Sequence, residues 1–364
     1  MNTVLHQVLA AATQSNASDI HIKEGFPVAY RIDGDIMSSN FVTSRELLEQ
    51  FMNEVANKKQ IEDYWVTGDL DLSHYEDEVG RFRVNIHRQR NLIAINFRWV
   101  KNKLMQVADL GLPDTLEMIA EYPRGIIIIM TGTPGSGKST TLAAMLEHIN
   151  QVRRAHIITI EDPIEYEFKD ESCIFEQREL GIDTISFASA LKHALRQDPD
   201  VIMVGEMRDR ESFDAALQAA DTGHLVISTL HASNATQTIN RLLDFYDKNE
   251  QDPIHEALAI NLKAVISQRL VQRAGGSGRA PAVEIMLNTA MVSKLIQENR
   301  LELLPAAVEA GREEGMMTFN QCLLDLVNNG VITEEDALEA SDNPEALKMN
   351  FQGIFLSAGG GIIG

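Results

Sequence analysis

The chain has 364 residues, of which 44% are hydrophobic and 23% charged, proportions typical of globular proteins long enough for two domains. The formal net charge of −21 disfavours binding to a polyanion and therefore disfavours a nucleic-acid motor. No apolar run is long enough to span a membrane, no signal peptide is expected, and Cys173 and Cys322 fit no metal-ligand spacing, so we expect a cytoplasmic protein without zinc.

The first hundred residues predict an α/β module with an antiparallel sheet. Apolar residues recur at helical spacing over residues 2–15, and residues 44–57 predict a second helix. Alternating apolar and polar residues predict short strands at residues 20–22 and 28–32 and two longer strands within residues 80–100.

Three arginines lie on the polar sides of the two longer strands. Because apolar residues take alternate positions there, Arg81 and Arg83 lie on the polar face of one strand and Arg98 on that of the next. A solvated basic face explains this pattern as well as a ligand contact does. The regular spacing is then lost over residues 101–113, where we expect a linker.

Short, wholly apolar strands alternate with helices in the second part of the chain. Strands that are buried on both faces have this pattern, which predicts a largely parallel sheet covered by helices. After about residue 250 the strand signals fade, and we expect helices to about residue 340. The predicted strands cover residues 126–130, 156–160, 201–204 and 225–229.

A phosphate-binding loop of the form G-x-x-x-x-G-K-S follows the first of these strands and precedes a helix over residues 139–149. In such a loop backbone N–H groups surround the phosphates of ATP, Lys138 reaches the β- and γ-phosphates, and Ser139 binds Mg²⁺. The alternative is a glycine-rich turn with no ligand. The predicted ATP-binding residues are Gly132, Thr133, Pro134, Gly135, Ser136, Gly137, Lys138, Ser139 and Thr140.

Carboxylates follow two of the predicted strands at the edge where open α/β sheets bind ligands. Glu161 and Glu165 come after one strand, and Glu206 comes after the next. ATP hydrolysis needs a polarised water and a Mg²⁺ ion held by the protein. We expect Glu165 to position the water and Glu206 to hold Mg²⁺ with Ser139, with Glu161 as a further candidate. For Glu206 considered alone, a solvated carboxylate is the alternative.

Two histidines flank the fourth strand of the parallel sheet. His231 closes the strand and reaches the catalytic edge, where it would sense the γ-phosphate or bridge to a neighbouring subunit, whereas His224 opens the strand at its other end. Considered alone, each is more typical of a structural histidine, because the spacing between them carries little information.

Four segments together resemble the secretion-type ATPases, and most closely the PilT and PilU family of twitching-motility retraction ATPases. The resemblance extends from about residue 3 to residue 348. The segments are ASDIH at 17–21, IITIEDPIEY at 157–166, LRQDPDVIMVGEMRD at 195–209 and TGHLVISTLHASNA at 222–235.

The resemblance implies a fold and roles for particular residues. It implies a PAS-like α+β domain over residues 1–100, the linker at 101–113, a RecA-like ATPase domain with a helical C-terminal subregion over 114–350, and an apolar, glycine-rich tail at 351–364. It further implies a homo-hexamer in which N-terminal arginines reach a nucleotide. The family's catalytic glutamate, Walker B glutamate, His-box histidines and inter-subunit arginines match Glu165, Glu206, His224 with His231, and Arg81, Arg83 and Arg98.

The resemblance also implies a function: ATP hydrolysis that powers pilus retraction through an inner-membrane platform protein, at the cytoplasmic base of the pilus. PilT-type chains carry AIRNLIRE where residues 291–298 read MVSKLIQE, and QRELGID at 177–183 is more similar to PilU, so we favour a PilU-type chain with a PilT-type paralogue as partner. Pro134 stands where threonine is usual. The alternatives are a pilus-assembly or type II secretion ATPase, an accessory ring protein, and a nucleic-acid translocase.

Overall fold

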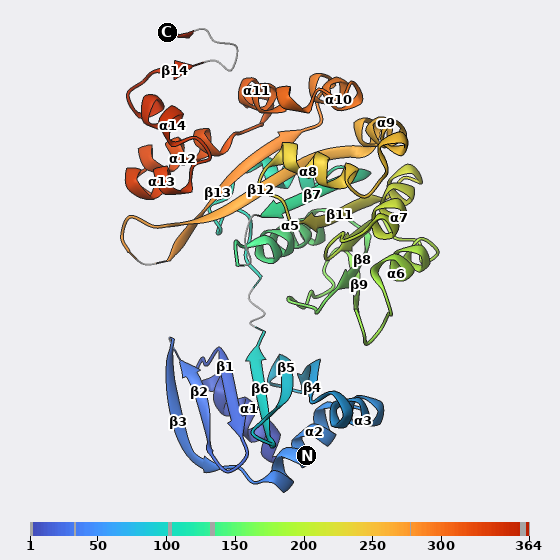
Figure 1. The fold of residues 1–364 in the computed structure, drawn as a ribbon, viewed down its shortest axis with the longest axis vertical. Helices are drawn as coiled ribbons and strands as arrows, with labels where there is room; N and C mark the ends of the chain where they lie inside the picture. The colour runs from blue at the N-terminus through green and yellow to red at the C-terminus, as the bar shows by residue number, and fades with distance from the viewer. Residues whose placement is uncertain are drawn as a thin grey trace. The chain divides into compact units, whose positions relative to one another are not determined.

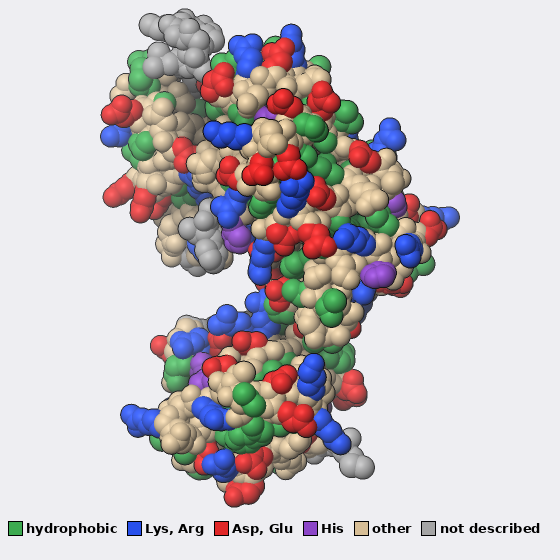
Figure 2. Space-filling view, turned by 45° about the vertical axis from the view of Figure 1, so that its right-hand side comes forward, with side chains coloured by type: hydrophobic (Ala, Val, Ile, Leu, Met, Phe, Trp, Pro, Cys, Tyr) green, Lys and Arg blue, Asp and Glu red, His purple; other side chains and the backbone are tan. Residues whose placement is uncertain are grey.

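The computed structural model describes residues 3–32, 34–100, 104–131, 135–276, 278–356 and 362–363. It divides into two units, Met1–Lys103 and Leu104–Gly364, which are described separately (Figure 1). No helix in these described residues is long and apolar enough to cross a membrane. On the face drawn in Figure 2, acidic side chains are spread over both units and interspersed with lysine and arginine.

The N-terminal unit is an antiparallel sheet of six strands in the order β3-β2-β1-β6-β5-β4. Its helices α1 and α2 are amphipathic, and Ser44 caps α2 by accepting a hydrogen bond from the backbone N–H of Leu47. The strands are β1 (Asp19–Lys23), β2 (Pro27–Ile32), β3 (Asp35–Val42), β4 (Asp69–Glu76), β5 (Gly80–Gln89) and β6 (Leu92–Trp99), and the helices are α1 (Val4–Gln14), α2 (Arg45–Val55) and α3 (Lys58–Thr67).

The alternation predicted for the two longer strands is confirmed in β5 and β6. Phe82, Val84 and Ile86 are buried in the core of this unit. In the antiparallel register Arg83 lies opposite Arg98, so the two arginines are cross-strand neighbours on the other face of the sheet. The polar face of this sheet therefore carries a local concentration of positive charge.

The second unit contains a sheet of seven strands in the order β13-β12-β7-β11-β10-β8-β9, in which only the β12–β13 pair is antiparallel (Figure 1). The four predicted strands are present. They could be recognised from the sequence because strands buried on both faces of a sheet have continuous apolar runs. They are β7 (Gly125–Thr131), β8 (His156–Glu161), β10 (Val201–Val204) and β11 (Leu225–Leu230); β9 (Ile174–Glu179) was not predicted.

The expectation that strands end near residue 250 is wrong. After α9 (Gln251–Asn261) the chain forms the two longest strands of this sheet, β12 (Leu262–Gln272) and β13 (Arg279–Leu287). Polar residues interrupt the apolar run of β12, but Ser267 and Gln268 are buried: Ser267 donates to Glu284 on the neighbouring strand, and Gln268 to Ser136, more than a hundred residues away. Sequence periodicity misses such a strand because the partners that satisfy its polar groups are remote.

Helices cover both faces of this sheet and form two hydrophobic cores. The C-terminal part is helical, as predicted, and ends in a two-stranded pair, β14 (Phe355–Leu356) and β15 (Ile362–Ile363); residues 357–361 and 364 of the expected tail lie outside the described residues. The remaining helices are α4 (Thr115–Ala120), α5 (Lys138–Val152), α6 (Phe187–Ala194), α7 (Arg210–Asp221), α8 (Ala235–Leu243), α10 (Ala290–Gln297), α11 (Leu304–Ala310), α12 (Phe319–Asn328), α13 (Glu334–Ala340) and α14 (Pro344–Phe351).

Glu284 on β13 makes stability depend on pH. Its Oε1 atom accepts a hydrogen bond of 2.7 Å from the backbone N–H of Ala235, the first residue of α8, and burial raises its pKa to about 7. A raised carboxyl pKa means that the folded state holds the proton more tightly than the unfolded state does. The free energy of unfolding therefore falls as the pH rises from 4.5, the ordinary pKa of a glutamate, towards 7.

We therefore expect Glu284→Gln, which keeps the acceptor without the charge, to be more stabilising at pH 8 than at pH 5. The difference between the two pH values is up to roughly 3 kcal/mol, from about 1.4 kcal/mol per pKa unit. Denaturant unfolding of both proteins at both pH values measures it. An effect of the substitution that is the same at pH 5 and pH 8 would contradict the assignment.

Candidate ATP-binding site

A cavity of about 300 Å³ lies at the carboxyl edge of β8, β10 and β11, beside the start of α5. Several of the residues predicted from the sequence meet there although they come from different elements. Because the carboxyl ends of parallel strands share one edge of the sheet, loops that follow separate strands converge on the same space. The predicted residues that line the cavity are Gly135, Lys138, Ser139, Glu161, Glu165, Glu206 and His231.

A side chain of β12 is hydrogen-bonded to the described part of the phosphate-binding loop. The Nε2 atom of Gln268 donates a hydrogen bond of 2.9 Å to the carbonyl oxygen of Ser136, and its Oε1 atom accepts one of 2.7 Å from the hydroxyl of Thr141. Gln268 is buried, so these bonds are made out of contact with water. Gly132, Thr133 and Pro134 lie outside the described residues.

Gly137 is required in this loop for two reasons. Its φ is +92°, a conformation that favours glycine, and a Cβ atom there would lie 2.6 Å from the Nε2 atom of Gln268. We expect Gly137→Ala to lower ATP affinity at least tenfold, because Gln268 cannot retreat without losing its bond to Ser136. Titration with a fluorescent ATP analogue measures the change.

Gly181→Ala is the matched control for this substitution. Gly181 has a similar φ of +81°, but nothing lies within 4 Å of its Cβ position. Both variants bear the backbone cost of a left-handed alanine, about 1–2 kcal/mol. Equal ATP affinities in the two variants would show that the contact with Gln268 does not matter.

A chain of charged and polar side chains crosses the cavity. Lys138 Nζ lies 3.4 Å from His231 Nδ1, and His231 Nε2 lies 3.3 Å from Glu206 Oε2. Glu206 also forms an ion pair with Arg208. Burial, together with the positive charges of Lys138 and two arginines, lowers the pKa of His231. These partners favour a neutral imidazole that donates from Nε2 to Glu206 and accepts from Lys138 at Nδ1.

Glu161 and Glu165 have different surroundings although both line the cavity. Glu161 is buried, and its Oε1 atom accepts hydrogen bonds from Thr159 Oγ1 (2.7 Å) and Gln177 Nε2 (3.1 Å), while burial raises its pKa. Its other oxygen accepts from the backbone N–H of Glu165 at 3.4 Å. The carboxylate of Glu161 thus supports the loop that carries Glu165.

Gln177 on β9 is hydrogen-bonded to residues that precede and residues that follow Glu165 in the chain. Besides Glu161, its Nε2 atom donates to the carbonyl oxygen of Tyr166 (2.8 Å), and its Oε1 atom accepts from the backbone N–H of Phe168 (2.9 Å). Gln177, Gln268 and Arg208 were missed as parts of the site. Gln268 had a recognisable signal, since a glutamine inside an apolar strand needs buried hydrogen-bond partners.

Two predicted residues, His224 and Thr140, do not line the cavity. His224 precedes β11 at its amino end, where its Nδ1 atom lies 2.9 Å from the carbonyl oxygen of Ala219, so it is separated from His231 by the length of the strand. The Thr140 hydroxyl lies 2.9 Å from the Tyr166 hydroxyl, linking α5 to the loop of Glu165.

The predicted arginines belong to the N-terminal unit. Arg98 forms an ion pair with Asp19, with Nε and Oδ1 2.7 Å apart. Burial acts to raise the pKa of Asp19, but hydrogen bonds from Arg98 and Ser18 outweigh it and the pKa is lowered. Asp19 therefore stays ionised and orients Arg98, while Arg83 lies opposite on β5.

Comparison with known proteins decides the family. The model of the family described as type II/IV secretion system protein matches residues 1–313. The type IV pilus retraction ATPase PilT of Pseudomonas aeruginosa is 39% identical over 340 residues, which cover 93% of this chain and 98% of PilT. This chain belongs to the PilT/PilU family of secretion ATPases. It is therefore an ATPase, as the phosphate-binding loop predicts.

Other members of the family agree. The type IV pilus ATPase PilU of the same organism is 38% identical over 344 residues, covering 94% of this chain and 90% of PilU. A crystal structure of the pilus retraction motor PilT with bound ADP has a TM-score of 0.87 and 42% identity, covering 94% of this chain and 98% of that one. The predicted fold class is confirmed by this likeness, whereas identities of 39% and 38% do not separate a PilT-type from a PilU-type chain.

Proposed function

We propose that this ATPase is a homo-hexameric motor that powers type IV pilus retraction and twitching motility. The proposal is carried by one observation: Lys138, Ser139, Glu165 and Glu206 line a single cavity in a chain that is related over nearly its whole length to a pilus retraction ATPase. ATP, which the bound ADP of the PilT structure supports as the ligand class, would place its phosphates at the start of α5.

The residues of the cavity suit ATP with Mg²⁺. Ser139 offers a hydroxyl and Glu206 a carboxylate, both hard oxygen donors of the kind that Mg²⁺ prefers, and these two residues would hold the ion. When bound, Mg²⁺ neutralises charge that develops on the phosphates. Lys138 binds the β- and γ-phosphates, and in doing so exchanges its contact with His231 for the nucleotide.

Hydrolysis needs a base for the attacking water. Glu165 lies in the cavity on a loop fixed by Glu161 and Gln177, so its carboxylate is held in place to orient a water and accept its proton. The water oxygen bonds to the γ-phosphorus as the bond to the ADP oxygen breaks, and ADP and phosphate leave. His231, freed from Lys138 and protonated at Nδ1, would donate a hydrogen bond to the γ-phosphate, while its Nε2–H stays on Glu206.

Assembly supplies the remaining groups. Arg81, Arg83 and Arg98 would reach the nucleotide of another subunit in the ring, and Asp19 pre-orients Arg98 for this role. The motor would act at the cytoplasmic side of the inner membrane, on the platform protein at the base of the pilus. Residues 291–298 read MVSKLIQE where PilT-type chains carry AIRNLIRE, and this difference favours joint action with a PilT-type paralogue.

Deletion of the gene tests the proposal. Loss of the retraction motor predicts hyperpiliated cells that do not twitch, and electron microscopy with a motility assay scores both. Normal piliation with lost motility would support the accessory role beside a PilT-type motor. Cells without pili would overturn retraction in favour of pilus assembly. Complementation with Lys138→Ala separates a catalytic role from a purely structural place in the ring.

A further inference from the structure

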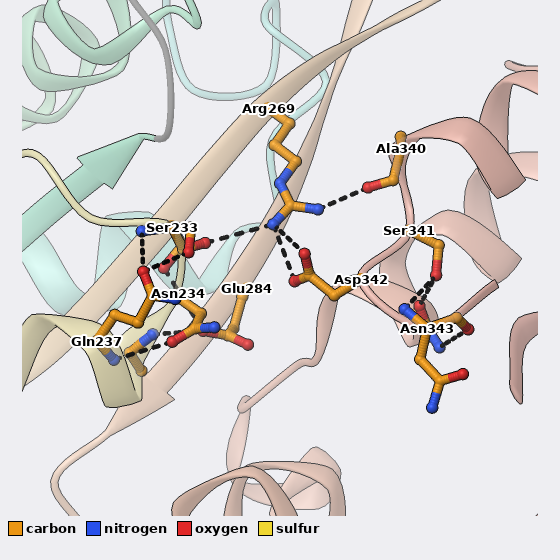
Figure 3. Close-up of polar contacts among 12 residues, drawn as sticks. Ser233, Asn234, Gln237, Arg269, Glu284, Ala340, Ser341, Asp342 and Asn343 are labelled. Carbon is orange, nitrogen blue, oxygen red and sulfur yellow. Dashed lines mark hydrogen bonds and ion pairs between the residues drawn. The ribbon is translucent and has the colours of Figure 1, made fainter.

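Consecutive residues of β12 reach two different parts of the second unit. Gln268 contacts the phosphate-binding loop, as described above, whereas the next residue, Arg269, points to the opposite face of the sheet. Figure 3 shows Arg269 extending from the strand towards the segment that joins α13 to α14. This arginine is 22% exposed and plays no part in the mechanism proposed above.

Arg269 joins segments that are far apart in the sequence. Its Nη2 atom donates to both carboxylate oxygens of Asp342, at 2.7 and 2.8 Å, and to the carbonyl oxygen of Ser233 at 3.4 Å. Its Nη1 atom donates to the carbonyl oxygen of Ala340 at 2.6 Å. The guanidinium group also lies over the ring of Phe319, 4.1 Å from its centroid. Three segments of the C-terminal half therefore converge on one side chain, and Figure 3 shows two of them, at Ser233 and at Ala340 with Asp342.

Ser233 belongs to the short loop between β11 and α8, residues 231–234, which begins with His231. One end of this loop is tied to the cavity by the contacts of His231 with Lys138 and Glu206. The other end is tied by Arg269 and by Asn234, whose side chain accepts a hydrogen bond from the backbone N–H of Gln237 and caps α8. The position of His231 thus depends on a loop whose far end is held by Arg269.

We propose that Arg269 is a positioning residue that makes ATP turnover depend on the docking of the C-terminal helices. Asp342, between α13 and α14, accepts from Nη2 of the guanidinium group at both carboxylate oxygens, and the same Nη2 atom donates to the loop of His231 at Ser233. Undocking of these helices releases Arg269 and lets His231 move away from the position at which it would meet the γ-phosphate. The proposal rests on the role of His231 in the proposed function, but it concerns ATP turnover rather than pilus retraction.

Asp342→Asn is the informative variant. It keeps the size of the side chain and one acceptor oxygen but removes the charge that makes the pair with Arg269 strong. We expect kcat for ATP hydrolysis by the full-length protein to fall about fivefold or more, with KM changed less than twofold. The phosphate-binding loop, which sets most of KM, is held separately by Gln268.

Asp325→Asn is the matched control. Asp325 on α12 pairs with Arg312 at 2.6 Å in the same helical part of the chain, and neither residue contacts the loop of His231 through any bond described above. Both variants lose one arginine–carboxylate pair, so their thermal midpoints should shift by similar amounts. Only Asp342→Asn should change kcat. An equal kcat in the two variants would overturn the proposal.

A double-mutant cycle tests the route through His231. If Arg269 acts by placing His231, Asp342→Asn lowers kcat in the parent protein but has no further effect in a His231→Ala background. Full additivity of the two losses would show that Asp342 acts elsewhere and would overturn the proposal. Should Asp342→Asn fail to fold, Arg269→Lys decides the question by the same kcat measurements, because it keeps the charge but has one nitrogen in place of the two that bond Asp342 and Ala340.

Discussion

Replacing Lys138 with alanine will abolish ATP hydrolysis and reduce ATP affinity at least a hundredfold. The cavity is lined by the carboxylates of Glu161, Asp162, Glu165 and Glu206, so a polyanionic nucleotide enters a region that already carries negative charge. Lys138 belongs to the phosphate-binding loop and lines the cavity. Two charge-assisted hydrogen bonds to phosphate, about 1.5–3 kcal/mol each, account for the loss of affinity.

The change is measured by titration with a fluorescent ATP analogue and by phosphate release. Lys192→Ala is the control, because Lys192 is an exposed lysine in an ion pair with Glu211, at 2.9 Å, outside the cavity. It should leave both measurements unchanged. If the Lys138 variant binds ATP normally, the cavity described here is not the nucleotide site.

Glu165→Gln will block turnover while leaving ATP bound. Glutamine keeps the size of the side chain and its hydrogen-bonding capacity but cannot accept a proton from the attacking water. Loss of a general base lowers turnover by about 10²–10⁴-fold. Because Lys138 and the loop amides still hold the phosphates, ATP affinity should change less than threefold, and the variant should accumulate as an ATP complex.

Single-turnover hydrolysis with radiolabelled ATP separates this loss of chemistry from slow product release. Glu167→Gln is the matched control: it lies two residues further along the same loop but does not line the cavity. Glu161→Gln tests the alternative base. If Glu161→Gln blocks hydrolysis and Glu165→Gln does not, the two roles are reversed, and Glu165 rather than Glu161 serves to support the loop.

The sequence by itself was sufficient for the four central strands of the second unit's sheet and for the phosphate-binding loop. Strands β8, β10 and β11 are buried on both faces, as are Ile126 and Ile127 of β7, so these apolar runs are recognised without reference to a partner strand. The loop motif between β7 and α5 is a local signal, because backbone amides, glycines and Lys138 are neighbours in sequence. The order of carboxylates after β8 and β10 likewise followed from the topology of parallel strands.

Only the tertiary structure decided how those residues are held. Strand β12 was missed because its polar residues are satisfied by remote groups: Gln268 by Ser136 and Thr141, and Arg269 by Ser233 and Asp342. Hydrophobic periodicity indicates which single side chains are buried. A buried hydrogen bond between residues a hundred positions apart cannot be recognised from the sequence around either residue. For the same reason, only the folded chain could distinguish Glu161, which supports its loop, from Glu165.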